Sequence, residues 1–177
     1  MKRLIFLLSS LVMIVVSVFG QSNPLDPMDF LIGDWSGTGS GFGNEKSRIE
    51  SRFLWVMNGT YIEVINDSKF DPTDKKPEGE NHIDRGFISY DRIREKIILR
   101  QFNSEGYVNQ YILSDSLSDD STLVFETESI ENLPNGKARW TIKRISESEY
   151  ETTFDVSFTG DEYSCMGVNH LKKRPGK

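Results

Sequence analysis

The sequence predicts an all-β protein: a single antiparallel up-and-down β-barrel of about ten strands, with a short helical turn before the first strand. Three observations favour it. Apolar and polar residues alternate with a period of two along almost every segment after Trp35, helical periodicity is nearly absent, and turn sequences recur at short intervals. Closing such a meander removes both exposed sheet edges, which favours a barrel over the alternative, a two-sheet sandwich.

The segment 148–160, "SEYETTFDVSFTG", is the clearest strand. One face carries Tyr150, Thr152, Phe154, Val156 and Phe158, and the other carries mainly charged and hydroxyl side chains, as in a strand with one buried face. By the same alternation, strands are expected at 34–43, 46–56, 59–67, 82–91, 95–103, 106–114, 121–130, 137–146, 149–159 and 162–173. The polar segment 71–81, with two prolines, is expected to be a loop, and 24–31 to form the helical turn.

The N-terminus is expected to be a signal peptide. Lys2 and Arg3 precede a run of about 16 mostly apolar residues, and Val18 and Gly20 are small enough for a cleavage site before Gln21. The run is shorter than the roughly 20 residues of a membrane span. We therefore expect residues 1–20 to be removed, residues 21–177 to form one exported domain, periplasmic or extracellular, and no membrane span to remain after cleavage.

The composition disfavours several functions. Without Lys2 and Arg3 the chain has 19 basic and 27 acidic residues, so its net charge is −8, which disfavours nucleic-acid binding. Cys165 is the sole cysteine, so no internal disulfide can form, and a small buried apolar role is expected for it. The two histidines make no metal-binding motif with it. No nucleophile–base pair is evident, so catalysis has no support. The oligomeric state is left open.

A glycine-rich stretch follows the first tryptophan. Gly37, Gly39, Gly41 and Gly43 alternate after Trp35, but their spacing does not fit a dinucleotide or phosphate loop, and no helix follows. A period of two places them on one face of a strand together with Gly33. Glycine in a strand indicates a bend or a close backbone approach, and a bend that helps the barrel to close is the favoured interpretation. The bare face could also border a hollow, and the two are compatible.

The same stretch, "FLIGDWSGTGSG", resembles the start of the first strand in the calycin superfamily of lipocalins, fatty-acid-binding proteins and nitrobindins. It is most similar to the exported bacterial DUF1579-type and nitrobindin-like proteins, and Gly86, Tyr90, Asp91 and Gly106 match a hairpin of the DUF1579 group. The resemblance implies a small barrel with a cavity. It says little about function, because one fold hosts many functions.

The resemblance also implies roles for the last strand. Calycins often end with a basic residue packed on the first-strand tryptophan, so Lys172, Lys173 or Arg174 is expected to cover Trp35. Nitrobindins bind haem through a last-strand histidine, and this chain has about Met166 at that place. His170 has the same strand parity but lies nearer the barrel end. No cofactor is predicted, and haem is kept as an alternative.

Candidate ligand-binding residues follow from strand parity. Aromatic side chains on apolar faces would fill the interior or line a pocket. Arg85 shares its parity with Phe87 and, if inward, could meet an anionic ligand group; a solvent-exposed Arg85 is the alternative. The candidates are Trp55, Tyr61, Arg85, Phe87, Tyr111, Trp140, Phe154, Phe158 and His170.

The leading functional hypothesis is binding of a small apolar or amphipathic ligand inside the barrel. A haem-binding protein and a filled barrel that acts through its surface are the alternatives. A continuous void below about 300 Å³ would favour the filled barrel, since typical ligand pockets are larger.

Overall fold

The computed structural model describes residues 23–41, 45–159 and 162–175. The expected signal peptide and Gly43 lie outside the described residues. The elements are η1 (Asp26–Leu31), β1 (Gly33–Gly41), β2 (Glu45–Val56), β3 (Tyr61–Phe70), β4 (Glu80–Asp91), β5 (Lys96–Asn103), β6 (Val108–Leu113), β7 (Thr122–Glu131), β8 (Lys137–Arg144), β9 (Glu149–Ser157) and β10 (Ser164–Lys173).

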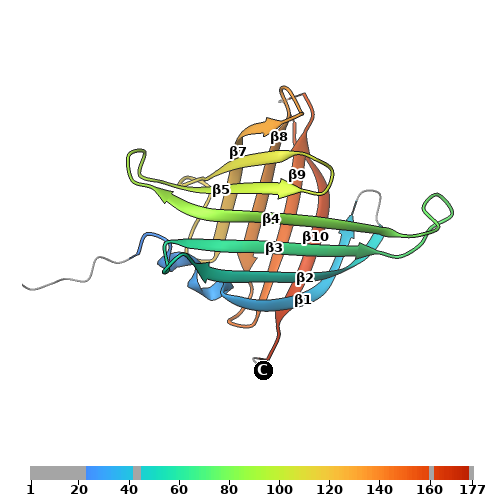
Figure 1. Cartoon of the computed structure of the whole chain (residues 1–177), viewed down its shortest axis with the longest axis horizontal. Coiled ribbons are helices and arrows are strands. Elements are labelled where there is room, and N and C mark those ends of the chain that lie inside the picture. Colours follow the sequence, from blue (N-terminus) through green and yellow to red (C-terminus); the bar gives the residue numbers. More distant parts are fainter. Residues whose placement is uncertain (1–22, 42–44, 160–161, 176–177) are drawn as a thin grey trace, which may run out of the picture.

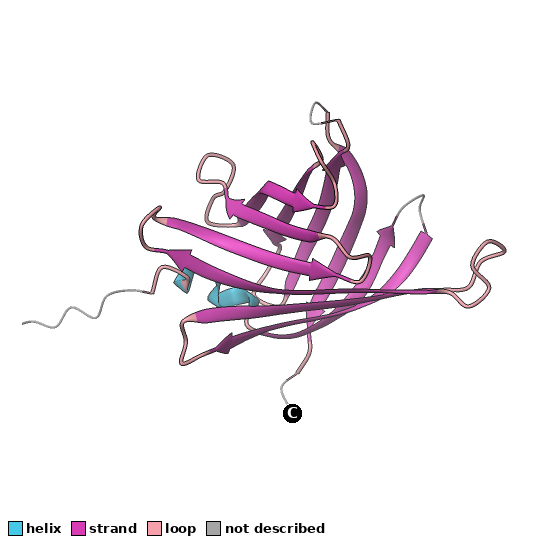
Figure 2. Cartoon of the chain, turned by 45° about the horizontal axis from the view of Figure 1, so that its top comes forward, coloured by secondary structure: helices cyan, strands magenta, loops and turns pink. Residues whose placement is uncertain are grey.

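The ten strands form a closed barrel in which each strand pairs with its sequence neighbours. β1 pairs antiparallel with both β2 and β10, so the sheet has no free edge. Figures 1 and 2 show β1–β5 passing in front of β7–β10 around a common interior. The predicted all-antiparallel barrel is thereby confirmed, with the short helical turn η1 ahead of β1.

The two ends of the barrel differ because the strands run up and down. The turn between β2 and β3 lies at the same end as η1, and the residues Met57, Asn58 and Gly59 in it have positive φ, as a tight hairpin requires. The β3–β4 and β5–β6 connections lie at the other end. We call these the plugged end and the open end.

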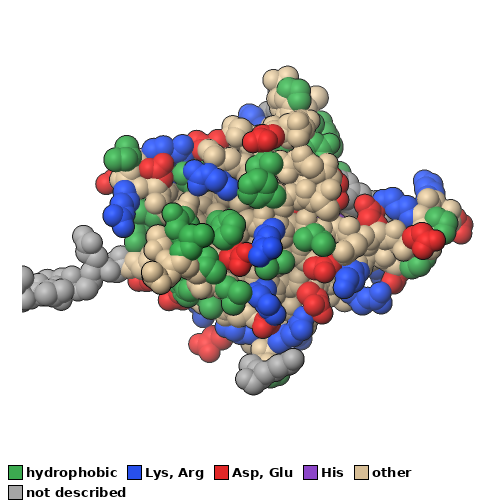
Figure 3. Space-filling model, in the orientation of Figure 1, with side chains coloured by type: hydrophobic (Ala, Val, Ile, Leu, Met, Phe, Trp, Pro, Cys, Tyr) green, Lys and Arg blue, Asp and Glu red, His purple; other side chains and the backbone are tan. Residues whose placement is uncertain are grey.

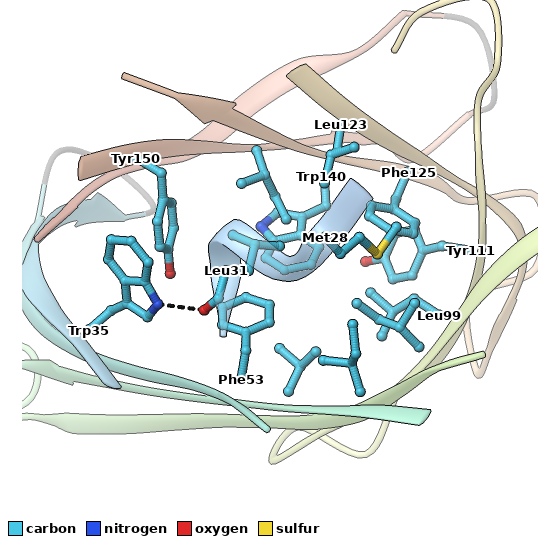
Figure 4. Packing of buried hydrophobic residues seen from close by; sticks show 14 of the residues in the cluster. Met28, Leu31, Trp35, Phe53, Leu99, Tyr111, Leu123, Phe125, Trp140 and Tyr150 are labelled. Atoms are coloured by element: carbon cyan, nitrogen blue, oxygen red, sulfur yellow. Dashed lines mark hydrogen bonds between the residues drawn. The ribbon is translucent and has the colours of Figure 1, made fainter. Parts of the chain in front are cut away.

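A dense apolar core fills the plugged end (Figure 4). Leu25, Met28 and Leu31, from η1 and the residue before it, are fully buried among strand residues such as Phe53 and Phe125. Trp35 is fully buried and its Nε1 donates a 2.6 Å hydrogen bond to the carbonyl of Leu31, which ties β1 to η1. The helical turn therefore acts as a plug.

The basic end of β10 covers Trp35 through one of the three expected residues. Lys173 Nζ lies 5.2 Å from the centre of the Trp35 ring, a cation–π contact. Lys172 pairs instead with Glu149 at 2.8 Å, and Arg174 with Glu50 at 2.9 Å, both on the outer surface. Of the three alternatives Lys173 is the one observed. Lys172, at an outward position of β10, and Arg174, just after β10, do not cover Trp35 because they meet outward carboxylates of β9 and β2.

The glycine face of β1 serves two purposes. A Cβ on Gly37 would lie 1.8 Å from the backbone oxygen of His170, so this glycine permits a close approach of β1 and β10. Gly41, near the open end, borders the barrel cavity, where a Cβ would meet the Phe70 ring. Gly39 lies between them against Asn169 and Ile49. The close backbone approach and the hollow are therefore both present, at different positions along β1.

Candidate functional site

The interior of the open end is hollow. A cavity of about 480 Å³ begins above the apolar core and reaches the strand ends away from η1. This volume exceeds the limit of about 300 Å³ below which a filled barrel would be favoured, and it is within the usual range of small-molecule pockets.

One wall of the cavity is polar. Inward positions of β3–β6 carry amide, hydroxyl and carboxylate groups, among them Asn66, Ser68, Asp84, Gln101, Asn103 and Asn109. Gln101 and Asn109 are directly paired across β5 and β6 and are only 7% and 5% exposed. Burying such groups without hydrogen bonds is costly, so this wall favours contents that can hydrogen bond.

The other wall is mainly apolar. Strands β7–β9 contribute Ile130, Ala138, Trp140, Tyr150, Phe154 and Val156. Trp140 packs beside Phe125 with ring centres 6.0 Å apart, so its ring also joins the cavity wall to the core (Figure 4). The hollow is therefore two-sided, polar toward β3–β6 and apolar toward β7–β9, and suits an amphipathic molecule.

The mouth of the cavity, at the open end of the barrel, carries a charged cluster of His82, Asp84 and Glu105. His82 Nδ1 lies 2.6 Å from Glu105 Oε1, and His82 Nε2 lies 3.2 Å from Asp84 Oδ1. The hydrogen bond with Asp84 is the main cause that raises the pKa of His82 to about 9, against the opposing effect of burial. His82 is therefore an imidazolium at neutral pH, with both nitrogens held by carboxylates.

Four of the candidate residues line the cavity: Tyr111, Trp140, Phe154 and Phe158. Tyr111 is 1% exposed and part of the polar wall, whereas Phe158 is 60% exposed at the mouth. Whether these side chains contact a ligand stays a prediction.

Trp55 points inward but lies at the plugged end. Its Nε1 donates a 3.0 Å hydrogen bond to Asp29 Oδ1 of η1, so it supports the plug and does not line the cavity.

Three candidates lie on the outer face, which corrects the expected inward placement of Tyr61 and Phe87 and leaves the solvent-exposed alternative for Arg85. Arg85 pairs with Glu63 at 2.7 Å on the surface. Tyr61 and Phe87 share an outer depression with Met57 and Phe102. Figure 3 shows hydrophobic side chains gathered on the outer face of the barrel. Arg85 and Phe87 do share one face of β4, but it is the solvent-facing one, on which apolar residues such as Phe87 also lie.

His170 and Cys165 also lie outside. The His170 side chain is 68% exposed, and its Nδ1 lies 3.2 Å from Glu151 Oε2. Cys165 is exposed, so the expected burial is wrong: the register of β10 shifts between Cys165 and Gly167, which brings Met166 to the cavity instead.

The sequence reasoning missed His82, Asp84, Gln101 and Asn109. The neighbouring strand β3 carries the information that could have found them. Glu63 lies on the same face of β3 as Tyr61, and its charge indicates that this face is exposed to solvent. Its partner across β3 and β4 is Phe87, which fixes the outward parity of β4 and leaves His82 and Asp84 inward.

A histidine-ligated haem does not fit the described residues. His170 points away from the interior, and both nitrogens of His82 are engaged by carboxylates while the ring is protonated at neutral pH. An imidazole must present an unprotonated nitrogen to bind a metal. No group of three or more His, Cys, Asp or Glu side chains within the described ranges is arranged to hold a metal ion.

The fold and the hollow together define a closed ten-strand antiparallel barrel with a two-sided interior cavity. Among solved structures, the chain is similar to Rv2717c from M. tuberculosis, with 14% identity and a TM-score of 0.61, covering 86% of this chain and 98% of that one. At this identity the likeness shows the fold alone.

Weaker likenesses include a redesigned β-barrel, b11L5F_LGL, with 12% identity and a TM-score of 0.43, covering 82% of this chain and 93% of that one. EF1p2_mFAP2b bound to DFHBI matches with 13% identity and a TM-score of 0.45, covering 84% of this chain and 97% of that one. No family model and no curated protein matches the sequence. Among the described residues, no helix has the length and apolar character to cross a membrane.

Proposed function

We propose that this barrel binds a small amphipathic molecule in its interior cavity. The observation that carries the proposal is the hollow of about 480 Å³ with one polar and one apolar wall. Binding would remove apolar ligand surface from water at the β7–β9 wall, worth roughly 25 cal/mol per Å² before the costs of association. Hydrogen bonds to the β3–β6 wall would set the orientation of the ligand.

A matched pair of substitutions tests this proposal. Thr152 lines the cavity and is 4% exposed, whereas Thr153 is the next residue of β9 and points out of the barrel. We expect the uncharged dye prodan to bind the wild-type protein with a blue-shifted emission. Thr152→Trp should weaken this binding at least tenfold by filling the cavity, and Thr153→Trp should leave it unchanged. Equal binding by both variants, or no binding to the wild type, would overturn the proposal.

The ligand of this proposal is not haem. The engaged nitrogens of His82 and the outward position of His170 support this inference. Hemin added to the purified protein is expected to keep its free Soret absorbance. A shifted Soret band that survives in His82→Gln and His170→Gln variants would point to another ligand, for which Met166 in the cavity wall is the first candidate.

We also propose that the protein acts outside the cytoplasm, periplasmic or extracellular. The basic start, the apolar run and the small residues before Gln21 support export. The intact mass of the protein isolated from its host is expected to match a chain that begins at Gln21. A mass that includes residues 1–20 would contradict the proposal.

A further inference from the structure

Three polar side chains of the cavity wall form a short hydrogen-bonded network. Asn109 Nδ2 donates to the Tyr111 hydroxyl at 3.0 Å, and that hydroxyl donates to Gln101 Oε1 at 3.4 Å. Burial raises the pKa of Tyr111, so the hydroxyl keeps its proton at neutral pH and can serve as the donor. Tyr111 therefore fixes the orientation of both amides.

This network leaves the amide nitrogen of Gln101 as an unused donor group and the amide oxygen of Asn109 as an unused acceptor. Within the described part of the chain, no hydrogen bond is found for the Gln101 amide nitrogen or the Asn109 amide oxygen. Both side chains are more than nine-tenths buried and line the cavity. They are direct partners across β5 and β6, and such pairs have Cβ atoms about 5 Å apart. A donor and an acceptor thus stand side by side on the polar wall.

We propose that this pair recognises the lactam or amide edge of a flat, uncharged ligand, an inference that rests on the proposed function. A ring –NH–C(=O)– offers one donor and one acceptor on the same edge, so it can accept from Gln101 and donate to Asn109. A carboxylate lacks the donor, so it can match Gln101 but not the acceptor of Asn109. Trp140 and Phe154 on the apolar wall suit the face of such a ring.

Two quinolones that differ by one methyl group test the inference. In displacement of prodan from the wild-type protein, 2-quinolone presents the lactam edge, whereas in 1-methyl-2-quinolone the donor is blocked. We expect 2-quinolone to bind about tenfold more tightly, because a buried polar pair left unmatched is costly. Gln101→Leu and Asn109→Leu should abolish this preference while prodan still binds. Gln110→Leu is the matched control, since Gln110 lies outside and contacts Glu128, and it should keep the preference.

The outcomes separate the two proposals. If prodan binds but both quinolones bind equally or not at all, the lactam inference is overturned while the ligand-binding proposal stands. A preference that survives in both leucine variants also overturns it, because the selectivity then comes from elsewhere. If prodan itself fails to bind the wild type, the proposed function fails. Far-UV circular dichroism and thermal unfolding verify that each variant is folded, and the wild-type comparison of the two quinolones holds regardless of the variants.

Discussion

At the scale of single residues, His82 makes the stability of the folded protein depend on pH. Its pKa of about 9 in the folded protein lies above the ordinary value of 6.5, mainly because of the hydrogen bond with Asp84. The charged ring therefore stabilises the fold fully below about pH 6.5, and this contribution is lost as the pH rises through 9. After allowance for solvent screening, we expect the wild-type free energy of unfolding to fall by about 1 kcal/mol over this range, as measured by urea unfolding.

The second histidine supplies the control for this prediction. His82→Gln should remove the fall, whereas His170→Gln, at an exposed position on the outer face, should retain it. If all three proteins follow the same pH profile, the ion-paired state of His82 is wrong.

Gly37 is the position where a single methyl group matters most in β1. A Cβ there would collide with the backbone of His170, which cannot move without separating β1 from β10. At Gly41 the obstacle is the side chain of Phe70, which can turn aside. We expect Gly37→Ala to destabilise the protein by about 3 kcal/mol and Gly41→Ala by less than about 1 kcal/mol in chemical unfolding. Similar losses for both would contradict the close approach of the two strands.

At the scale of elements, η1 stabilises the plugged end without shaping the cavity. Met28 is fully buried in the core, and truncation of such a side chain costs about 2–5 kcal/mol. Met28→Ala should therefore lower the free energy of unfolding by that amount, while the affinity of the folded protein for prodan stays the same. Asp26→Ala, at an exposed position of the same turn, should change neither quantity. A large loss of prodan affinity in Met28→Ala would show that the two ends are not independent.

The elements also show how far the sequence could predict the site. β9 carries apolar side chains on one face alone, so the inward positions of Phe154 and Val156 follow from alternation. β4 carries Phe87 on its outer face and Ile88 on its inner face, so its local alternation does not define the interior. There the parity is set by pairing with Glu63 on β3, which is information from another strand.

The polar wall escaped prediction for a related reason. Asn109 and Gln101 look like ordinary surface residues in the sequence, and their burial arises only when β5 and β6 face the hollow. Apolar residues mark the interior of most barrels, so a polar interior reverses the usual pattern. The fold was predictable because the number of strands and their up-and-down order depend on local alternation and turns, whereas the chemistry of the cavity depends on which strand faces meet.

At the scale of the whole molecule, the residues that stabilise the barrel and the space that can hold a ligand lie at opposite ends of it. The core at the plugged end holds the strands together, and the open end keeps a hollow that the strands alone do not fill. A closed sheet tolerates such a hollow because all strands keep their hydrogen-bonded neighbours. The central claim is therefore that the hollow holds a small molecule.

Native mass spectrometry of the protein isolated from its own host tests this claim most directly. The wild-type protein and the Thr153→Trp variant are expected to carry the same non-covalent small-molecule adduct, which is released on denaturation. The Thr152→Trp variant, with its cavity filled, is expected to lack it. An adduct that persists in Thr152→Trp, or a wild-type protein that carries none under conditions that preserve known complexes, would contradict the account.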